Sequence, residues 1–272
     1  MNSAILMQPQ PVKLRLRGLA LPNEHGSWGF LFEPIVAGLA IAFSPAAPWL
    51  ALTVIGAFLL RQPLKVFISD RLAGRNLPQT NAALRFAAAF SLVLAVGLIM
   101  SFLLSPLAGF IPFALVLPLG IYQIYCDISR KTREAIPEIT GAIAMSSSAA
   151  AIAVASGMTW QAAAAIWMFL IARLIPSILY VRERLRLEKG KDYAFVLPAA
   201  AHLTALGGIS YLAVIGLLPY LVIPVFAVLL ARCVHGLSSY RVKMKAMKIG
   251  IWEVIYGVLT VLSLIVGYYM QF

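Results

Sequence analysis

A ladder of polar and cationic side chains follows one face of the apolar segment 47–69. Arg61, Lys65 and Ser69 are spaced by four residues, so they share one face of a helix. Such a ladder can bind a diphosphate, because Arg makes bidentate contacts with phosphate oxygens. The alternative is ordinary interfacial charge, but Arg61 lies deep enough in the segment for its charge to be costly, which favours a function. Three charged residues follow the ladder: Asp70, Arg71 and Arg75.

The segment 159–181 ends in a similar way. Arg173 and Pro176 precede Arg182 and Glu183, which repeats the order of a deep Arg, a proline and a charged cluster in the first segment. The parallel indicates a duplicated half-unit with a binding site between two helix ends, unless so loose a match arises by chance. On this interpretation Arg173 and Arg182 join the first ladder as anion ligands.

Three carboxylates lie within or at the start of other apolar segments. Glu33 immediately precedes Pro34, which removes a backbone donor and predicts a kinked helix. Ionisable groups in apolar helices are costly and usually face an interior or a cavity. For Glu138 and Glu253, pairing with Arg or contact with the membrane interface is an equally good interpretation. Glu33 lies deeper, and a functional role is favoured for it.

Two further candidates lie at helix ends. His25, within Glu24–Trp28, is a candidate general base or ligand. The alternative is a helix-capping cluster beside an interfacial Trp, and the two interpretations weigh equally. Arg130 follows the segment 107–126 and adds a cation near Asp127.

The elements that carry these residues are predicted transmembrane helices. The chain has 272 residues, 61% hydrophobic and 12% charged, which is about half the charge of a soluble domain. This excludes a water-soluble globule, a disordered chain and a disulfide scaffold. Each of nine apolar segments has about 17–24 residues, enough to cross ~30 Å of hydrocarbon as a helix. We therefore predict an all-α, polytopic transmembrane bundle. Its predicted helices are 28–44, 47–69, 83–104, 107–126, 137–157, 159–181, 193–216, 218–236 and 249–270.

The charges predict the orientation of this bundle. All 22 Lys and Arg residues precede the first segment or lie near the ends of the second, fourth, sixth and eighth. The other junctions carry no charge, and this alternation is typical of the positive-inside rule. It predicts a multi-pass protein of the cell membrane with a cytoplasmic N-terminal tail, residues 1–22. Residues 23–272 form a single transmembrane domain whose C-terminus lies outside.

The polar residues are confined to one side of the membrane. All ten carboxylates lie toward the predicted cytoplasmic side, so the outer half of the protein is almost wholly apolar. A channel or an alternating-access carrier needs polar lining on both halves, which argues against either class. Basic loops of this kind attract anionic lipid head groups, so the net charge of +12 does not indicate a nucleic-acid partner. The pattern suits a ligand with a polar head and an apolar chain.

The sequence resembles a known family at two places. Glu24–Trp28 and Lys248–Glu253, together with the nine-helix plan, resemble the YwiC-like integral membrane proteins. The plan is also similar to the UbiA-type intramembrane prenyltransferases, which have nine helices and a cavity on the cytoplasmic side. In that superfamily, Asp-rich motifs after the second and sixth helices bind Mg²⁺ and a prenyl diphosphate, and a lipophilic acceptor is alkylated. At the matching positions this chain has only Asp70 and Glu183 among basic residues.

The leading hypothesis is a UbiA-like transferase that acts on a prenyl diphosphate or a similar amphipathic substrate and a lipophilic acceptor. Asp70 and Glu183 would orient the cations or hold a single metal, for which Mg²⁺ at Asp70 is the candidate. His25 or Glu33 would act as base or stabilise a cation. The anionic head group would be bound by Arg61, Lys65, Arg71, Arg75, Arg130, Arg173 and Arg182.

The principal alternative is not an enzyme. A lipid- or quinone-binding membrane protein of the same fold accounts for the missing aspartates, and its partners would be membrane lipids and an isoprenoid or quinone-like small molecule. A carrier for a small anion is a third hypothesis, against which the uncharged outer half argues. The sequence leaves open which of these the protein is.

Overall fold

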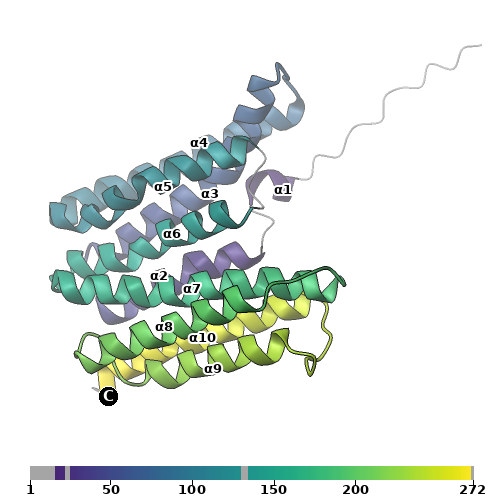
Figure 1. The fold of residues 1–272 in the computed structure, drawn as a ribbon. Helices are drawn as coiled ribbons and strands as arrows, with labels where there is room; N and C mark the ends of the chain where they lie inside the picture. The colour runs from purple at the N-terminus through teal and green to yellow at the C-terminus, as the bar shows by residue number, and fades with distance from the viewer. Residues whose placement is uncertain (1–15, 22–24, 130–133, 271–272) are drawn as a thin grey trace, which may run out of the picture.

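A computed structural model describes residues 16–21, 25–129 and 134–270 of the chain. The described residues form helices connected by short loops and contain no strand, so the predicted all-α bundle is confirmed. After a short helix, α1 (Leu16–Ala20), nine longer helices follow, one for each predicted segment (Figure 1). They are α2 (His25–Ile41), α3 (Ala47–Leu72), α4 (Pro78–Leu104), α5 (Ile111–Ile128), α6 (Ala135–Ala155), α7 (Trp160–Glu188), α8 (Val196–Val214), α9 (Val222–Leu237) and α10 (Ala246–Met270), with a 3₁₀ turn, η1 (Leu107–Phe110), before α5.

Seven segments are long and apolar enough to cross a membrane: α3, α4, η1 with α5, α6, α7, α8 and α10. The protein is therefore a multi-pass membrane protein. The other two predicted spans are shorter, because α2 has 17 residues and α9 has 16. At 1.5 Å per residue each of these helices rises about 25 Å, somewhat less than the hydrocarbon thickness.

The connections alternate in charge along the described chain. Residues 42–46, 105–110, 156–159 and 215–221 contain no Lys, Arg, Asp or Glu, and the C-terminal end of α10 lies with them (Figure 1). We call the opposite end, where α3, α7 and α9 terminate, the basic end; it lies at the right of Figure 1. Gly74 and Gly190, with φ of 65° and 67°, follow α3 and α7 there, in a conformation that favours glycine.

Several helices extend beyond the predicted apolar segments at this end, and α3 and α7 are the two that carry predicted site residues there. The prediction ended them at residues 69 and 181, whereas α3 continues to Leu72 and α7 to Glu188. Charged residues that were expected just after the ends of these two helices are therefore part of the helices. Their spacing follows the turn of a helix, which decides the helix face on which each side chain lies.

Small residues let the helices approach closely. A Cβ atom added at Gly56 of α3 would lie 2.7 Å from the Leu94 nitrogen of α4, and one at Gly97 of α4 would lie 2.7 Å from the Thr53 nitrogen. Close approach at small residues is a common basis of helix packing in membranes. These contacts hold α3 and α4 together as a hairpin at one side of the bundle.

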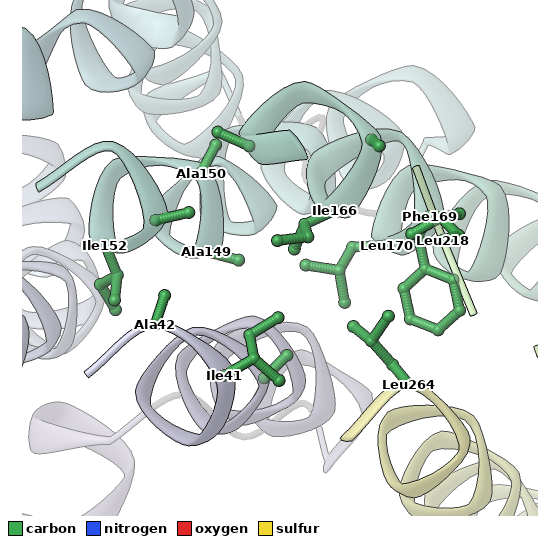
Figure 2. Packing of buried hydrophobic residues seen from close by; sticks show 14 of the residues in the cluster. Ile41, Ala42, Ala149, Ala150, Ile152, Ile166, Phe169, Leu170, Leu218 and Leu264 are labelled. Atoms are coloured by element: carbon green, nitrogen blue, oxygen red, sulfur yellow. The ribbon is translucent and has the colours of Figure 1, made fainter. Parts of the chain in front are cut away.

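The main hydrophobic core lies among α2, α6, α7, α8, α9 and α10, and Ala47 and Leu50 at the start of α3 also belong to it. Figure 2 shows its central packing, where Ile41 faces Ala149 and Ile166, and Phe169 and Leu170 meet Leu264 of α10. Buried Ser147, Ser148 and Thr260 lie beside these apolar residues on α6 and α10. The candidate site residues lie nearer the basic end and around a cavity among α3, α4, α5 and α6.

Candidate functional site

A buried ion pair joins α3 to α5 at the depth of the predicted ladder. Arg61 donates to both carboxylate oxygens of Asp127, through Nη2 at 2.9 Å from Oδ1 and through Nε to Oδ2. Asp127 is almost completely buried, with 2% of its side chain exposed, whereas 22% of the Arg61 side chain is exposed. Gln123 lies one turn before Asp127 on α5, and its Nε2 donates to Oδ1 at 3.3 Å. Removal of either partner of such a pair leaves a buried charge unpaired.

A large apolar cavity begins at this ion pair. We call it the chain cavity; its volume is about 510 Å³ and its walls come from α3, α4, α5 and α6. Arg61, Lys65, Gln123 and Asp127 supply its polar residues, and nearly all others are apolar. The apolar walls include Phe58, Leu64, Leu94, Leu117, Ala144 and Met145.

The chain cavity meets a second, more polar cavity. This head cavity, of about 260 Å³, lies among α2, α3, α5, α6 and α7. Arg61, Gln123, Gly141 and Met145 line both cavities. A Cβ atom at Gly141 would lie 3.1 Å from Gln123 Oε1, so glycine lets Gln123 sit between the two spaces. A single ligand with a polar end and an apolar end fits this arrangement.

The head cavity carries a second ion pair. Arg182 of α7 lies 3.1 Å from Glu138 Oε2 of α6, and about a third of each side chain is exposed. Both residues line the head cavity with Arg61 and Ser27. Arg61 of α3 and Arg182 of α7, which come from the two helix ends with similar sequences, thus line the same cavity. Each already faces a carboxylate, so the head cavity is less positively charged than the ladder alone implied.

Arg173 lies in a different place. It forms a buried charge network with Glu33 of α2, Arg232 of α9 and Glu253 of α10. Its Nη2 is 3.7 Å from Glu33 Oε1 and its Nη1 is 3.7 Å from Glu253 Oε2, while Arg232 Nη1 lies 2.6 Å from Glu253 Oε1. The network therefore links four helices, α2, α7, α9 and α10, and Arg173 does not line the head cavity.

Neighbouring polar groups complete the buried charge network. Arg173 and Arg232 both donate to Ser177 Oγ, and Arg232 Nη2 lies 3.2 Å from His202 Nε2. The Arg232 guanidinium also stacks over the Tyr180 ring, at 4.4 Å. The network contains two guanidinium groups and two carboxylates, so its charges balance.

Asp70, the predicted metal ligand, accepts hydrogen bonds from the start of α4. Asp70 is buried, and its Oδ2 accepts from Thr80 Oγ1 at 2.7 Å and from Gln79 Nε2 at 3.2 Å. It therefore anchors the start of α4. Among the described residues no three His, Cys, Asp or Glu side chains lie close enough to hold a metal ion. These residues do not fit the Mg²⁺–diphosphate site that the UbiA-type plan implies.

Three other predicted site residues, Glu183, Arg71 and Arg75, line neither cavity. Glu183 accepts from the Ala194 backbone N–H at 2.7 Å, Arg71 lies over the Phe67 ring at 5.4 Å, and Arg75 is exposed in the turn after α3. The His25 backbone begins α2, but its side chain and all of Arg130 lie outside what the structure describes.

Comparison with known families gives one match. Residues 21–153 match the model of the YwiC-like protein family. The family resemblance is thus confirmed for this part of the chain. The YwiC-like region runs from the start of α2 almost to the end of α6, so it holds Arg61, Asp127 and all four walls of the chain cavity. No curated protein and no solved structure matches the chain.

Some residues of these clusters were not predicted, although the sequence contains partial signals for them. Gln123 and Asp127 are spaced by four residues at the end of an apolar segment, which places two polar groups on one helix face within the YwiC-like region. In the sequence, Arg232 is only one charged residue near the end of an apolar segment. Its partners lie on α7, α8 and α10, and no local spacing indicates them.

Proposed function

We propose that this protein binds an amphipathic lipid, of the isoprenoid or quinone-like class, with its chain in the chain cavity and its polar head at Arg61. The observation that carries the proposal is the meeting of an apolar cavity of about 510 Å³ with a polar one at Arg61 and Gln123. Ligand sites of this kind are largely apolar, with a few polar groups that fix the orientation.

The packing of α4 and α5 supports entry from the membrane. Both helices supply walls of the chain cavity, yet they make little or no direct contact with each other. Leu98 of α4 and Ile121 of α5 both line the cavity. A lipid chain can pass between them without leaving an apolar environment, which avoids the cost of exposing the chain to water.

The charges favour a head group of low net charge. Arg61 and Arg182 each face a carboxylate, so a multiply charged head would have to displace these pairs. A neutral head, such as a quinone or an alcohol, can accept a hydrogen bond from Arg61 without breaking the Asp127 pair. Arg has five N–H donors, enough for both partners.

Prenyl transfer is the second candidate function. Three cations, Arg61, Lys65 and Arg182, line the two joined cavities, so a diphosphate bound at their junction would compete with Asp127 and Glu138 for Arg61 and Arg182. A transferase would release diphosphate from a prenyl diphosphate when a lipophilic acceptor is supplied. A binding protein would hold the prenyl chain without turnover.

Photoaffinity labelling tests the binding proposal. Purified protein in lipid nanodiscs would be irradiated with a diazirine analogue of farnesol and digested for mass spectrometry. We expect labels on α3, α4, α5 and α6 facing the chain cavity. Ala144→Phe fills part of the cavity and should abolish these labels, whereas Ala164→Phe, on an exposed face of α7, should leave them unchanged. Equal labelling of all membrane-facing helices in both variants would refute the proposal.

We also propose that the basic end faces the cytoplasm, in the cell membrane. The alternation of charged and uncharged connections supports this orientation. Single cysteines at Arg75 and at Gly216 would be tested with an impermeant maleimide on intact cells, after replacement of buried Cys126 and Cys233. We expect labelling at position 216 alone, and the reverse result would invert the orientation.

A further inference from the structure

A third cavity lies at the basic end, apart from the chain and head cavities. This C-terminal cavity, of about 200 Å³, is enclosed by α7, α9, the loop after α9 and α10. It lies outside the YwiC-like region and shares no lining residue with the other two cavities. Its polar and aromatic walls include one carboxylate, Glu253, together with Arg184, Arg232, His235, Arg241, Trp252 and Tyr256.

A triad of charged residues, Arg184, Arg241 and Glu188, borders this cavity and forms two ion pairs. Arg184 Nη2 lies 2.8 Å from Glu188 Oε1, and Arg241 Nε lies 3.7 Å from the same oxygen. Two guanidinium groups thus share one carboxylate. The neighbouring charge network, to which Arg232 belongs, is balanced, so the described ion pairs around the cavity leave one net positive charge. A buried net charge is costly unless an opposite charge accompanies it.

The two arginines of the triad differ in how they are held. Arg184 is buried and donates to the backbone carbonyls of Gly236 and Val242, so it fixes the loop after α9. Arg241 lies in that loop and is held there by its ion pair with Glu188. Among the described residues the buried Nε atoms of both arginines lack an acceptor, but only Arg184 donates through its Nη atoms to backbone carbonyls. The Arg241 guanidinium is therefore the group best suited to bind an additional anion.

Aromatic side chains form the wall toward the membrane. Trp252 and Tyr256 of α10 lie at the cavity, and 41% of Trp252 is exposed. Trp and Tyr are enriched at the level of lipid head groups. Basic pockets between transmembrane helices near this level bind anionic lipid head groups.

We propose that the C-terminal cavity is an anion site that binds one phosphate group, from an anionic phospholipid or from free phosphate. Arg241 supplies the principal charge-assisted hydrogen bond, while Arg184 and Arg232 provide a fixed positive wall. This ligand is a monoanion that balances the surplus charge of the triad. The site is independent of the lipid proposed for the chain cavity.

Lipid and phosphate binding to the full chain test this site. The protein would be reconstituted in phosphatidylcholine nanodiscs with or without phosphatidylglycerol, and lipids retained after purification would be counted by native mass spectrometry. Inorganic phosphate would be titrated separately, with the melting temperature as the readout. Arg241→Gln should weaken binding about tenfold or more, since it removes a charge-assisted hydrogen bond. Arg241→Lys keeps the charge and should retain most of the affinity.

Two further variants make the test decisive. Arg186→Gln is the matched control, because this side chain is 55% exposed and pairs with Glu183 outside the cavity. Glu188→Gln removes the shared carboxylate and should strengthen binding, so the proposal predicts changes of opposite sign at Arg241 and Glu188.

The outcomes separate the sources of phosphate. Retention of phosphatidylglycerol that is lost in Arg241→Gln identifies a lipid head group, whereas stabilisation by inorganic phosphate without lipid preference identifies free phosphate. The proposal is overturned if wild-type protein binds neither, or if Arg241→Gln and Arg186→Gln have the same effect.

Discussion

The Arg61–Asp127 pair predicts an asymmetric response to mutation. Arg61→Gln leaves the Asp127 carboxylate, only 2% exposed, with the 3.3 Å hydrogen bond from Gln123 as its remaining partner. Breaking a buried pair in this way costs roughly 3–5 kcal/mol, so we expect a loss of about 4 kcal/mol in the free energy of unfolding. Asp127→Asn instead leaves Arg61, which is 22% exposed, facing an amide oxygen that can still accept. We expect this change to cost about 2 kcal/mol.

The double variant, Arg61→Gln with Asp127→Asn, provides the decisive comparison. With both charges removed, the two introduced amides form a neutral pair, so the double variant should lose no more stability than Arg61→Gln alone. The coupling free energy would then be about 2 kcal/mol or larger. Unfolding would be followed by circular dichroism in mixed micelles of dodecyl maltoside and sodium dodecyl sulfate. Arg75→Gln, exposed in the turn after α3, is the control and should change stability by under about 0.5 kcal/mol. The reasoning would be refuted if Arg61→Gln and Asp127→Asn lost the same free energy of unfolding and the two losses added in the double variant.

Two other substitutions test the remaining polar clusters. A Cβ atom at Gly257 would lie 2.7 Å from Glu33 Cδ, so Gly257→Ala should disturb the Glu33–Arg173 pair and cost about 2 kcal/mol. Gly250→Ala, on the same helix with open space around it, is the control, and equal losses in the two variants would contradict the prediction. Asp70→Ala removes the hydrogen bonds that anchor α4 and should cost roughly 1–3 kcal/mol in the same unfolding assay. The loss should be equal with Mg²⁺ and with a chelator; a Mg²⁺-dependent stabilisation of wild type that this variant lacks would restore the metal role.

The number and order of the helices could be predicted from the sequence. Hydropathy located the segments, and the alternation of charged and uncharged junctions checked their number. The ends were less accurate, because α3 and α7 continue past their apolar stretches to Leu72 and Glu188. The last turns of these helices are rich in charged residues. Such turns can be helical, but they are not apolar, so hydropathy alone does not detect them.

The candidate site could be predicted only in part. Arg61 and Arg182 were chosen for their depth and for the parallel between two helix ends, and both line the head cavity. Arg173 was chosen by the same parallel, but its partners come from α2, α9 and α10. Which charges pair depends on the helices that pack together, and spacing along one segment does not contain this information.

The same limit applies to Asp70 and Asp127. Asp70 follows the cationic ladder in sequence, yet it faces α4 and binds Thr80. Asp127 lies 66 residues from Arg61, and it is the carboxylate that reaches the ladder. The packing of α5 beside α3 produces that contact.

Identification of co-purified lipid tests the central claim most directly. Wild-type protein and the Ala144→Phe variant would be purified from the same membranes, and their bound lipids compared by mass spectrometry. The account predicts an isoprenoid or quinone-like lipid in near-stoichiometric amount with wild type and its loss from Ala144→Phe, while Ala164→Phe retains it. Only bulk phospholipid, in equal amounts from all three proteins, would contradict the account.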